Sequence, residues 1–382
     1  MTARTAALAR TFVDTRSLVF WVMAALGLYG VVRLTPFVLQ SAMLDPLTGM
    51  VAALIWAAYA VLFAVIIYRL ELFERRSPVT MLGAYLWGAV VVAGIGLIAS
   101  PAANELLAKL LPESTEAWVS AIAAGVVEEP LKMLGIVALA FIPGARINSA
   151  IDGLYYGLLV GLGFEVTESF LYSVAAGADQ AGGGISLVVM TFVLRGVIGG
   201  LWNHPTFTAI TGAGVGYFFA STASLAKRVT ALVGTLAAAI SLHIFFDSPV
   251  LESDNPLLPT IVKGLPILVL FIVLYRVAQR RERAVFDRVG REDVPAHLIS
   301  EHELEILISR SARRKARKAA RQQAGLAAGH ATKRLQRRQS SLIASITEEG
   351  PDASRTAEVA TEVDEARAVL ESIMRGDDSA HV

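Results

Sequence analysis

The sequence contains no cysteine and has few charged residues outside its C-terminal part. Of its 382 residues, 18% are charged and 54% are hydrophobic, and the mean hydropathy is +0.56. Soluble domains usually have about 25% charged residues. The lack of cysteine excludes disulfides, cysteine-ligated zinc and a thiol nucleophile. The composition therefore predicts a polytopic membrane protein with a soluble tail that holds most of the charge after residue 275.

Two familiar hydrolase signatures are also missing. The sequence has no Gly-x-Ser-x-Gly turn, which presents a nucleophilic serine, and no His-Glu-x-x-His zinc pattern. No small-residue cleavage pattern lies near the first apolar run, so we expect a retained span there and not a signal peptide.

Eight apolar runs are long enough to cross about 30 Å of hydrocarbon. They lie at about residues 18–34, 50–68, 79–99, 118–142, 151–175, 186–220, 229–247 and 260–278. The sixth run is too long for one straight span and is either one broken helix or two short ones. The fold prediction is an all-α polytopic protein of the cell membrane, with about eight transmembrane helices in residues 1–280 and a charged cytoplasmic tail in residues 281–382.

The positive-inside rule sets the expected orientation. If the sixth run crosses once, the basic loops all fall inside and the acidic loops outside, and both termini are cytoplasmic. The loops that decide this carry Arg4, Arg10, Arg16, Arg69, Arg75, Arg76, Arg146, Lys227 and Arg228 inside, and Glu113, Asp179, Asp247, Glu252 and Asp254 outside.

The tail has two segments of opposite charge. Residues 310–338 hold eleven basic residues and no acidic one, within a helix predicted from Glu301 to about Gln339. An acidic helix is predicted over residues 355–375, after Gly350-Pro351. A basic helix next to a membrane is typical of contact with anionic lipid headgroups. Pairing with the acidic helix is the alternative, and nucleic acid is not an expected partner.

Four consecutive apolar runs carry ionisable side chains, each of which costs about 2.5–3.5 kcal/mol at the centre of a bilayer. Such groups persist where they face a wet cavity, pair with each other or do chemistry. Their depths along the spans predict that they meet at one cavity in the outer half of the membrane. They are Glu128, Glu129 and Lys132; Glu165 and Glu168; Arg195 and His204; and His243 and Asp247.

Local spacing supports pairing between these groups. Glu128 and Lys132 lie four residues apart on one helical face, and Glu165 and Glu168 also share a face. Pro130 frees a main-chain carbonyl, and Asn203-His204-Pro205 predicts a helix break. Structural roles compete with catalysis at each position: an ion pair with Lys132, a hydrogen bond from His204 to a freed carbonyl, and helix ends at His243 or Asp247.

Two kinds of chemistry fit such a set. Histidines and carboxylates are suitable zinc ligands, with a spare glutamate as base. A glutamate with two histidines can equally activate a water without a metal. The residues alone leave the metal open.

Taken in order, the polar motifs resemble those of the PrsW family, bacterial intramembrane proteases related to the CaaX-prenyl-protease and bacteriocin-processing group. The motifs are Glu128-Glu129-x-x-Lys132, Phe164-Glu165-x-x-Glu168, His204 with Thr208, and His243-x-x-x-Asp247. The resemblance covers about residues 118–250 and excludes the tail. Three positions depart from the related group, which has histidine at Glu168 and often asparagine at Asp247, and whose members use arginine at Lys132.

The resemblance implies a role for each motif residue. Glu128 would be the catalytic base acting on water, and the other expected catalytic residues are Glu129, Glu168, His204 and His243. Lys132, Glu165 and Asp247 would support them. If a metal is bound, possibly zinc, the expected ligands are Glu168, His204 and His243.

The predicted function is an intramembrane endopeptidase that hydrolyses a peptide bond in or near the transmembrane segment of a single-pass membrane protein. The resemblance suggests an anti-sigma-factor-like substrate. The alternative is a proton-coupled transporter that uses the glutamates and histidines as a relay, but the inverted repeats typical of transporters are not evident. A scaffold that only presents the tail would leave the polar clusters unexplained.

Overall fold

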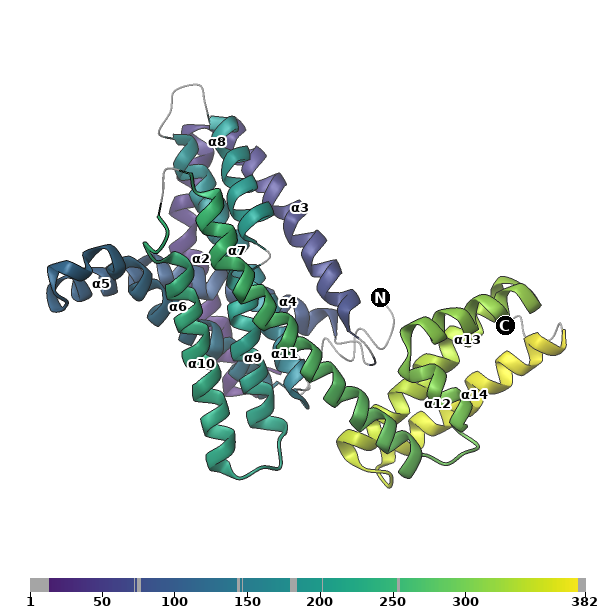
Figure 1. Ribbon diagram of the computed structural model, residues 1–382. Coiled ribbons are helices and arrows are strands. Elements are labelled where there is room, and N and C mark those ends of the chain that lie inside the picture. The colour runs from purple at the N-terminus through teal and green to yellow at the C-terminus, as the bar shows by residue number, and fades with distance from the viewer. Residues whose placement is uncertain are drawn as a thin grey trace. The chain divides into compact units, whose positions relative to one another are not determined.

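The computed structural model consists of helices and connecting loops, with no strand, in the residues that it describes, which are 14–71, 73, 77–142, 145, 147–178, 184–200, 202–252 and 255–376 (Figure 1). The helices before the polar centre are α2 (Leu18–Leu44), α3 (Pro46–Leu70), α4 (Pro78–Leu86), η1 (Trp87–Val92), α5 (Ala93–Leu110) and η2 (Glu113–Thr115). Those that follow are α6 (Glu116–Ala140), α7 (Ala150–Ala178), α8 (Gly184–Thr191), η3 (Phe192–Gly199), α9 (His204–Ala220), α10 (Leu225–Asp247), α11 (Leu257–Glu292), α12 (Glu301–Ile308), α13 (Arg310–Glu349) and α14 (Ser354–Arg375).

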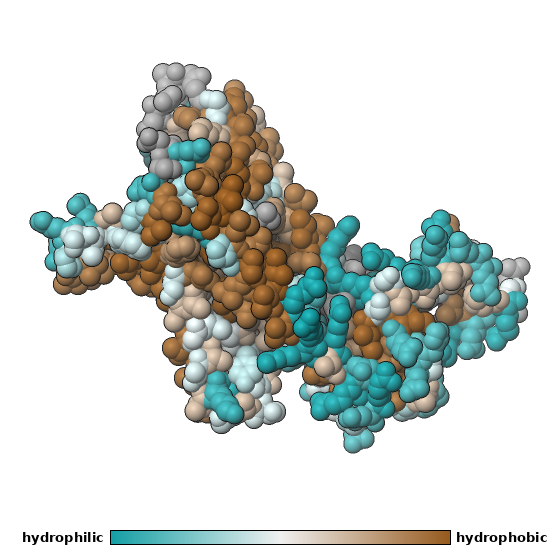
Figure 2. Space-filling model, viewed as in Figure 1, coloured by the Kyte–Doolittle hydropathy of each residue, from teal (hydrophilic) through white to brown (hydrophobic). Residues whose placement is uncertain are grey.

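The chain forms two compact units. Unit 1 comprises residues 1–69 and 76–278, and unit 2 comprises residues 70–75 and 279–382. Helix α11 contributes to both units, because its first part belongs to unit 1 and its last turns to unit 2. Hydrophobic residues cover most of the visible face of the unit 1 bundle, and hydrophilic residues cover most of unit 2 (Figure 2).

Seven helical stretches of the described chain are long and apolar enough to cross a membrane. They match seven of the eight predicted spans. The remaining one, α6, is a 25-residue helix that carries Glu128, Glu129 and Lys132 in its middle and is therefore less apolar than the others. The protein is an all-α polytopic membrane protein, as predicted.

The sixth apolar run forms one helical path with a break. Helix α8 is followed directly by η3, which ends at Gly199, and α9 begins at His204, where the sequence predicted the interruption. Figure 1 shows α8 at one end of the bundle and α9 running to the other end, so the run is a single broken helix. Two π-helical stretches, η1 and η3, were not predicted.

Glycines let α7 and α9 pack with their backbones in contact. Gly153, Gly157 and Gly161 are spaced four residues apart on α7, and a Cβ added to each would lie 2.0, 2.3 and 2.4 Å from a main-chain oxygen of α9. The oxygen opposite Gly161 belongs to His204. This small-residue stripe is typical of helix pairs in membranes, and it fixes the position at which α9 begins.

Unit 2 has its own hydrophobic core. Side chains from the end of α11, from the loop before α12, and from α12, α13 and α14 pack together; they include Phe286, Leu304, Leu335, Ile343 and Val363. Phe73, which lies between α3 and α4 in the sequence, packs against them. Ser300 and Glu303 form a capping box at the start of α12. Glu303 then pairs with Arg367 of α14 through two bonds of 2.8 and 2.9 Å.

The predicted helix from Glu301 to Gln339 is divided at two points. Ser309 ends α12 and caps α13, its side chain accepting a hydrogen bond from the Ala312 amide. Ala324 and Gly325 are non-helical, and Gly325 has φ +81°, a conformation that glycine adopts readily. The two arms of α13 fold against each other, with Arg317 donating to Gln336 at 2.6 Å. The prediction of one uninterrupted helix was wrong.

The orientation across the membrane stays a prediction. Of the loop residues on which it depends, Arg4, Arg10, Arg75, Arg76, Arg146, Asp179 and Asp254 lie outside the described residues.

Candidate functional site

Helix α6 places a lysine between two carboxylates. The Lys132 ammonium donates to Glu129 Oε1 at 2.8 Å and to Glu128 Oε2 at 3.2 Å. It also lies 4.0 Å from the centre of the Phe164 ring. All three ionisable residues are buried. Burying charges is costly, and the two ion pairs with the ring contact offset much of that cost.

Helix α7 and the π-helix η3 form a second polar group. Arg195 Nη2 pairs with Glu168 Oε2, and Arg195 Nε donates to Ser169 Oγ at 3.0 Å. Ser169 in turn donates to Glu165 Oε1 at 2.9 Å. The Arg195 guanidinium also stacks over the Tyr172 ring, 4.3 Å from its centre. Arg195 therefore holds Glu168 in place.

His204, the first residue of α9, joins the two groups. Its Nδ1 lies 3.1 Å from the Lys132 ammonium, and its Nε2 lies 3.0 Å from Glu168 Oε2. An ammonium can only donate, so Nδ1 accepts that hydrogen bond and the ring proton is on Nε2, which donates to Glu168. The contacts thus assign one tautomer to a neutral His204.

His243, in the last turns of α10, lies between two carboxylates. Its Nδ1 is 3.0 Å from Glu129 Oε1, and its Nε2 is 3.1 Å from Asp247 Oδ2 and 3.9 Å from Glu128 Oε2. A histidine with a carboxylate at each nitrogen is placed to donate from both, which is the arrangement of an imidazolium. Asp247 is both the last residue of α10 and a partner of His243.

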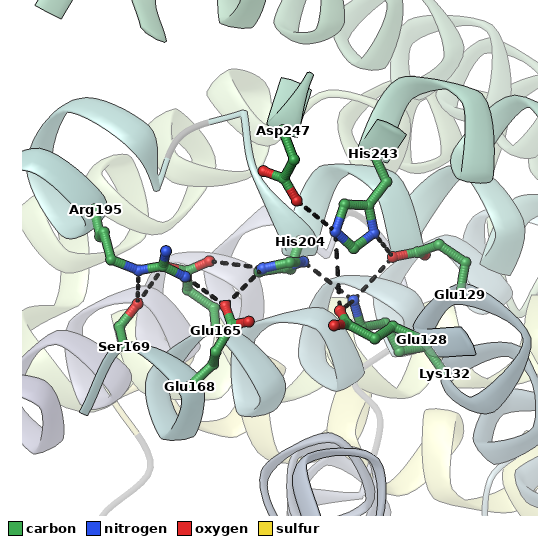
Figure 3. A network of polar contacts seen from close by, with 10 residues as sticks. All are labelled: Glu128, Glu129, Lys132, Glu165, Glu168, Ser169, Arg195, His204, His243 and Asp247. Carbon is green, nitrogen blue, oxygen red and sulfur yellow. Dashed lines mark hydrogen bonds and ion pairs between the residues drawn. The ribbon is translucent and has the colours of Figure 1, made fainter. Parts of the chain in front are cut away.

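These contacts form one chain of alternating donors and acceptors across α6, α7, η3, α9 and α10 (Figure 3). It runs from Arg195 through Glu168, His204, Lys132, Glu129 and His243 to Asp247. All eight site residues predicted from the sequence belong to this cluster. The sequence predicted from their depth along the spans that these residues converge, and in the structure they do.

One side of the cluster faces a cavity of about 890 Å³ within unit 1. Polar residues of the site that line it are Glu128, Glu168, Arg195, Asn203, His204 and Asp247. Glu129, Lys132, Glu165 and His243 are at most 1% exposed. The cavity-lining residues can therefore contact a bound molecule, whereas the buried ones can only position the cavity-lining residues.

Three residues of the cluster have side chains of the kinds that bind metal ions. Glu128, His204 and His243 each offer a ligand atom, and these three atoms lie within 4.8 Å of one another. The converging carboxylate is Glu128, where the sequence prediction had Glu168. The hydrogen bonds do not fit a bound ion as arranged, because Lys132 already donates to Glu128 and to His204 Nδ1, and both nitrogens of His243 face carboxylates. We therefore derive no chemical step through a metal.

Sequence reasoning missed several contributors. Ser169 had no distinguishing context in the sequence, yet it links Arg195 to Glu165. Lys263 is buried in α11 and donates to the Ser248 carbonyl at 2.8 Å, just beyond the end of α10. A lone lysine in an apolar span is itself a signal, since it has to find a partner.

Comparisons with known proteins found a matching family and a curated relative. A family model described as PrsW family intramembrane metalloprotease matches residues 76–277, somewhat more than half of the chain. A curated relative, Protease PrsW of Bacillus subtilis (strain 168), is 35% identical over 85 residues, which are 22% of this chain and 38% of the relative. The match thus spans well under half of that relative's length. No solved structure matches the chain.

Proposed function

Because this chain belongs to the PrsW family of intramembrane metalloproteases, we propose that it is an intramembrane endopeptidase that cleaves a single-pass membrane protein in or near its transmembrane segment. The family match favours this function over a proton-coupled transporter. The observation that carries the proposal is the position of Glu128, a cavity-lining carboxylate in the same cluster as His204 and His243.

Glu128 acts as the general base on a water in the cavity. Its carboxylate takes a proton from the water as the oxygen attacks the peptide carbonyl carbon, and it returns that proton to the amine that leaves. The ion pair with Lys132 fixes the carboxylate, and Lys132 is fixed in turn by Glu129 and His204. His204 faces the cavity, where its position is set by Glu168 and Arg195.

Glu128, Glu168, His204 and Asp247 face the cavity, whereas Glu129, Lys132, Glu165 and His243 position them. Zinc is assigned no step, because Lys132 and the carboxylates beside His243 already occupy the atoms of Glu128, His204 and His243 that would hold it. An anti-sigma-factor-like substrate is proposed from the resemblance alone.

Proteolysis by the wild type and by Glu128→Gln tests this assignment. Each full-length protein is reconstituted in liposomes with a panel of single-pass membrane peptides, with and without a strong chelator. We expect cleavage by the wild type and a loss of at least about 10²-fold in the variant, because general base catalysis contributes about 10²–10⁴-fold. Glutamine keeps the size of the side chain and its hydrogen-bond acceptor, so the variant should insert and unfold like the wild type.

The outcomes separate the alternatives. Cleavage at the wild-type rate by Glu128→Gln would refute the role of Glu128. Wild-type activity that chelator removes and zinc restores would assign a metal to the cluster. Activity that persists in chelator would assign water activation to Glu128 alone.

A second proposal concerns unit 2. We propose that its basic segment, residues 310–338, contacts anionic lipid headgroups. Seven of its basic side chains are exposed in the structure: Arg314, Lys315, Lys318, Arg321, Lys333, Arg334 and Arg337. Each contributes about 1 kcal/mol of attraction near an anionic surface.

A further inference from the structure

Asn203 lies at the break between η3 and α9, directly before His204. The residue is 4% exposed and lines the cavity. Its Oδ1 atom has no hydrogen-bond partner within the described part of the chain. A buried polar atom without a partner is costly, and native structures contain few of them. The atom therefore points to something that binds there.

The usual reason for an asparagine at a helix start does not apply. Asparagine is a preferred N-cap residue because its side chain accepts a hydrogen bond from the first turn. Asn203 is the N-cap of α9, but its side chain makes no capping hydrogen bond. Its main-chain oxygen accepts from the Thr206 amide at 2.8 Å instead. The side chain of this cavity-lining residue is thus not used to cap α9.

A second polar atom without a partner lines the same cavity. Ser100 Oγ, on α5, is buried, and it too lacks a partner among the described residues. Serine in a helix often bonds the carbonyl of the preceding turn, and here it does not. Two such atoms on different helices fit a ligand that carries polar groups along its length, as a peptide main chain does.

We propose that the Asn203 side-chain amide binds the main chain of the substrate beside the bond that is cleaved, an inference that rests on the proposed function. A carboxamide offers both an acceptor and donors, which match the N–H and C=O groups of a peptide. In an intact transmembrane helix these main-chain groups are bonded internally. The bound segment is therefore unwound where it meets Asn203.

Binding to an inactive protein tests the assignment without depending on catalysis. The full-length Glu128→Gln protein is compared with Glu128→Gln/Asn203→Ala in liposomes, using the fluorescent peptide from the panel that binds Glu128→Gln most tightly. We expect the Kd to rise about tenfold, as for the loss of one or two hydrogen bonds. The midpoint of thermal unfolding should not fall, because Asn203 Oδ1 has no hydrogen-bond partner among the described residues.

Two further variants sharpen the comparison. Asn203→Ser keeps a residue that helix starts favour but is too short to reach the same group, so it should weaken binding as alanine does. Asn148→Ala is the matched control, since Asn148 is exposed in the loop before α7, and it should leave the Kd unchanged.

The inference and the proposed function can fail separately. A Kd unchanged within about twofold in both Asn203 variants would overturn the role of Asn203. Weaker binding accompanied by a lower unfolding midpoint in both variants would also overturn it, because Asn203 would then be structural. If the wild type cleaves no peptide in the panel, the proposed function fails, while the binding comparison still decides the role of Asn203.

Discussion

Lys132 is the residue on which the polar cluster depends. Its ammonium contacts Glu128, Glu129 and His204, and it is fully buried. Replacing Lys132 with an uncharged residue would leave the buried Glu128 without its ion pair at 3.2 Å, and breaking a buried ion pair typically costs about 3–5 kcal/mol. Most substitutions here therefore disturb folding and chemistry together. Glu128→Gln, which keeps a hydrogen-bond acceptor for Lys132, is the variant that separates the two.

The pair of Glu303 and Arg367 gives a pH-dependent prediction in unit 2. Burial raises the pKa of Glu303, but hydrogen bonds from Arg367 and from the Ser300 main chain outweigh it and hold the pKa below its usual value. A lowered pKa stabilises the fold above the unfolded value, about 4.3, and this contribution is lost as the pH falls through and below that value. We expect amide hydrogen exchange in α12 and α14 to quicken on acidification from pH ~7 to ~3.5.

Glu303→Gln is the matched variant for this pair. In this variant, amide exchange in α12 and α14 should already be faster than in the wild type at neutral pH. The ratio of the rates should correspond to about 1 kcal/mol of lost stability. The wild type and the variant should then converge at low pH, after rates are corrected for intrinsic exchange. A difference between them that persists at low pH would contradict the assignment.

At the residue scale, the sequence predicted the site through the cost of burying charge. Glu128, His204 and Asp247 could be selected because an apolar span has no other reason to carry them. Ser169 and Asn203 carry no such cost signal, since uncharged polar residues are common in spans. Which carboxylate faces the cavity depends on helix rotation, and spacing alone does not determine it.

At the scale of elements, the close approach of α7 to α9 sets the position of His204. A Cβ at Gly161 would lie 2.4 Å from the His204 carbonyl oxygen and 2.6 Å from Pro205 Cα. Gly161→Ala should therefore push the start of α9 away and separate His204 from Glu168. We expect stability to fall by about 1–3 kcal/mol and cleavage by up to about 10²-fold, since a displacement of about 1 Å can cost that much.

Gly234→Ala is the control for that prediction. Gly234 lies within α10, and an added Cβ would meet nothing within 4 Å. Alanine favours a helix interior by about 1 kcal/mol relative to glycine, so this variant should be as stable as the wild type or more so. Thermal unfolding in detergent and cleavage of the same peptide compare the two. Full activity in Gly161→Ala would show that the close contact does not position His204.

The sequence predicted helices better than their interruptions. Long apolar runs predicted every spanning helix, and Asn203-His204-Pro205 predicted the break before α9. The π-helix η1 lies at long-range contacts that local spacing does not indicate: Trp87 donates to the Leu131 carbonyl at 3.0 Å, and Gly88 packs against the Val160 main chain. The turn at Gly325 in α13 depends on packing between the two arms, which no local pattern encodes.

At the scale of the whole molecule, a membrane bundle and a charged helical unit share one continuous helix. Helix α11 begins in an apolar stretch and runs unbroken to Glu292 in unit 2. The two units are therefore joined by helix and not by a loop at this point of the chain. The acidic helix α14 neutralises only part of the basic segment, through the pair of Arg338 and Glu362 at 2.6 Å.

The last prediction concerns the exposed basic side chains of residues 310–338. We expect amide exchange in the first arm of α13 to slow when the full-length protein is moved from nanodiscs of neutral lipid to nanodiscs containing anionic lipid. Neutralising Arg314, Lys315, Lys318 and Arg321 to glutamine should abolish the change, since each contributes about 1 kcal/mol of attraction. Arg355→Gln, at the start of α14, is the control, and in this variant exchange should still slow in anionic lipid. Because the attraction is electrostatic, added salt should weaken the protection. Equal exchange in both lipids would rule out headgroup contact and leave the basic arm as a solvated surface.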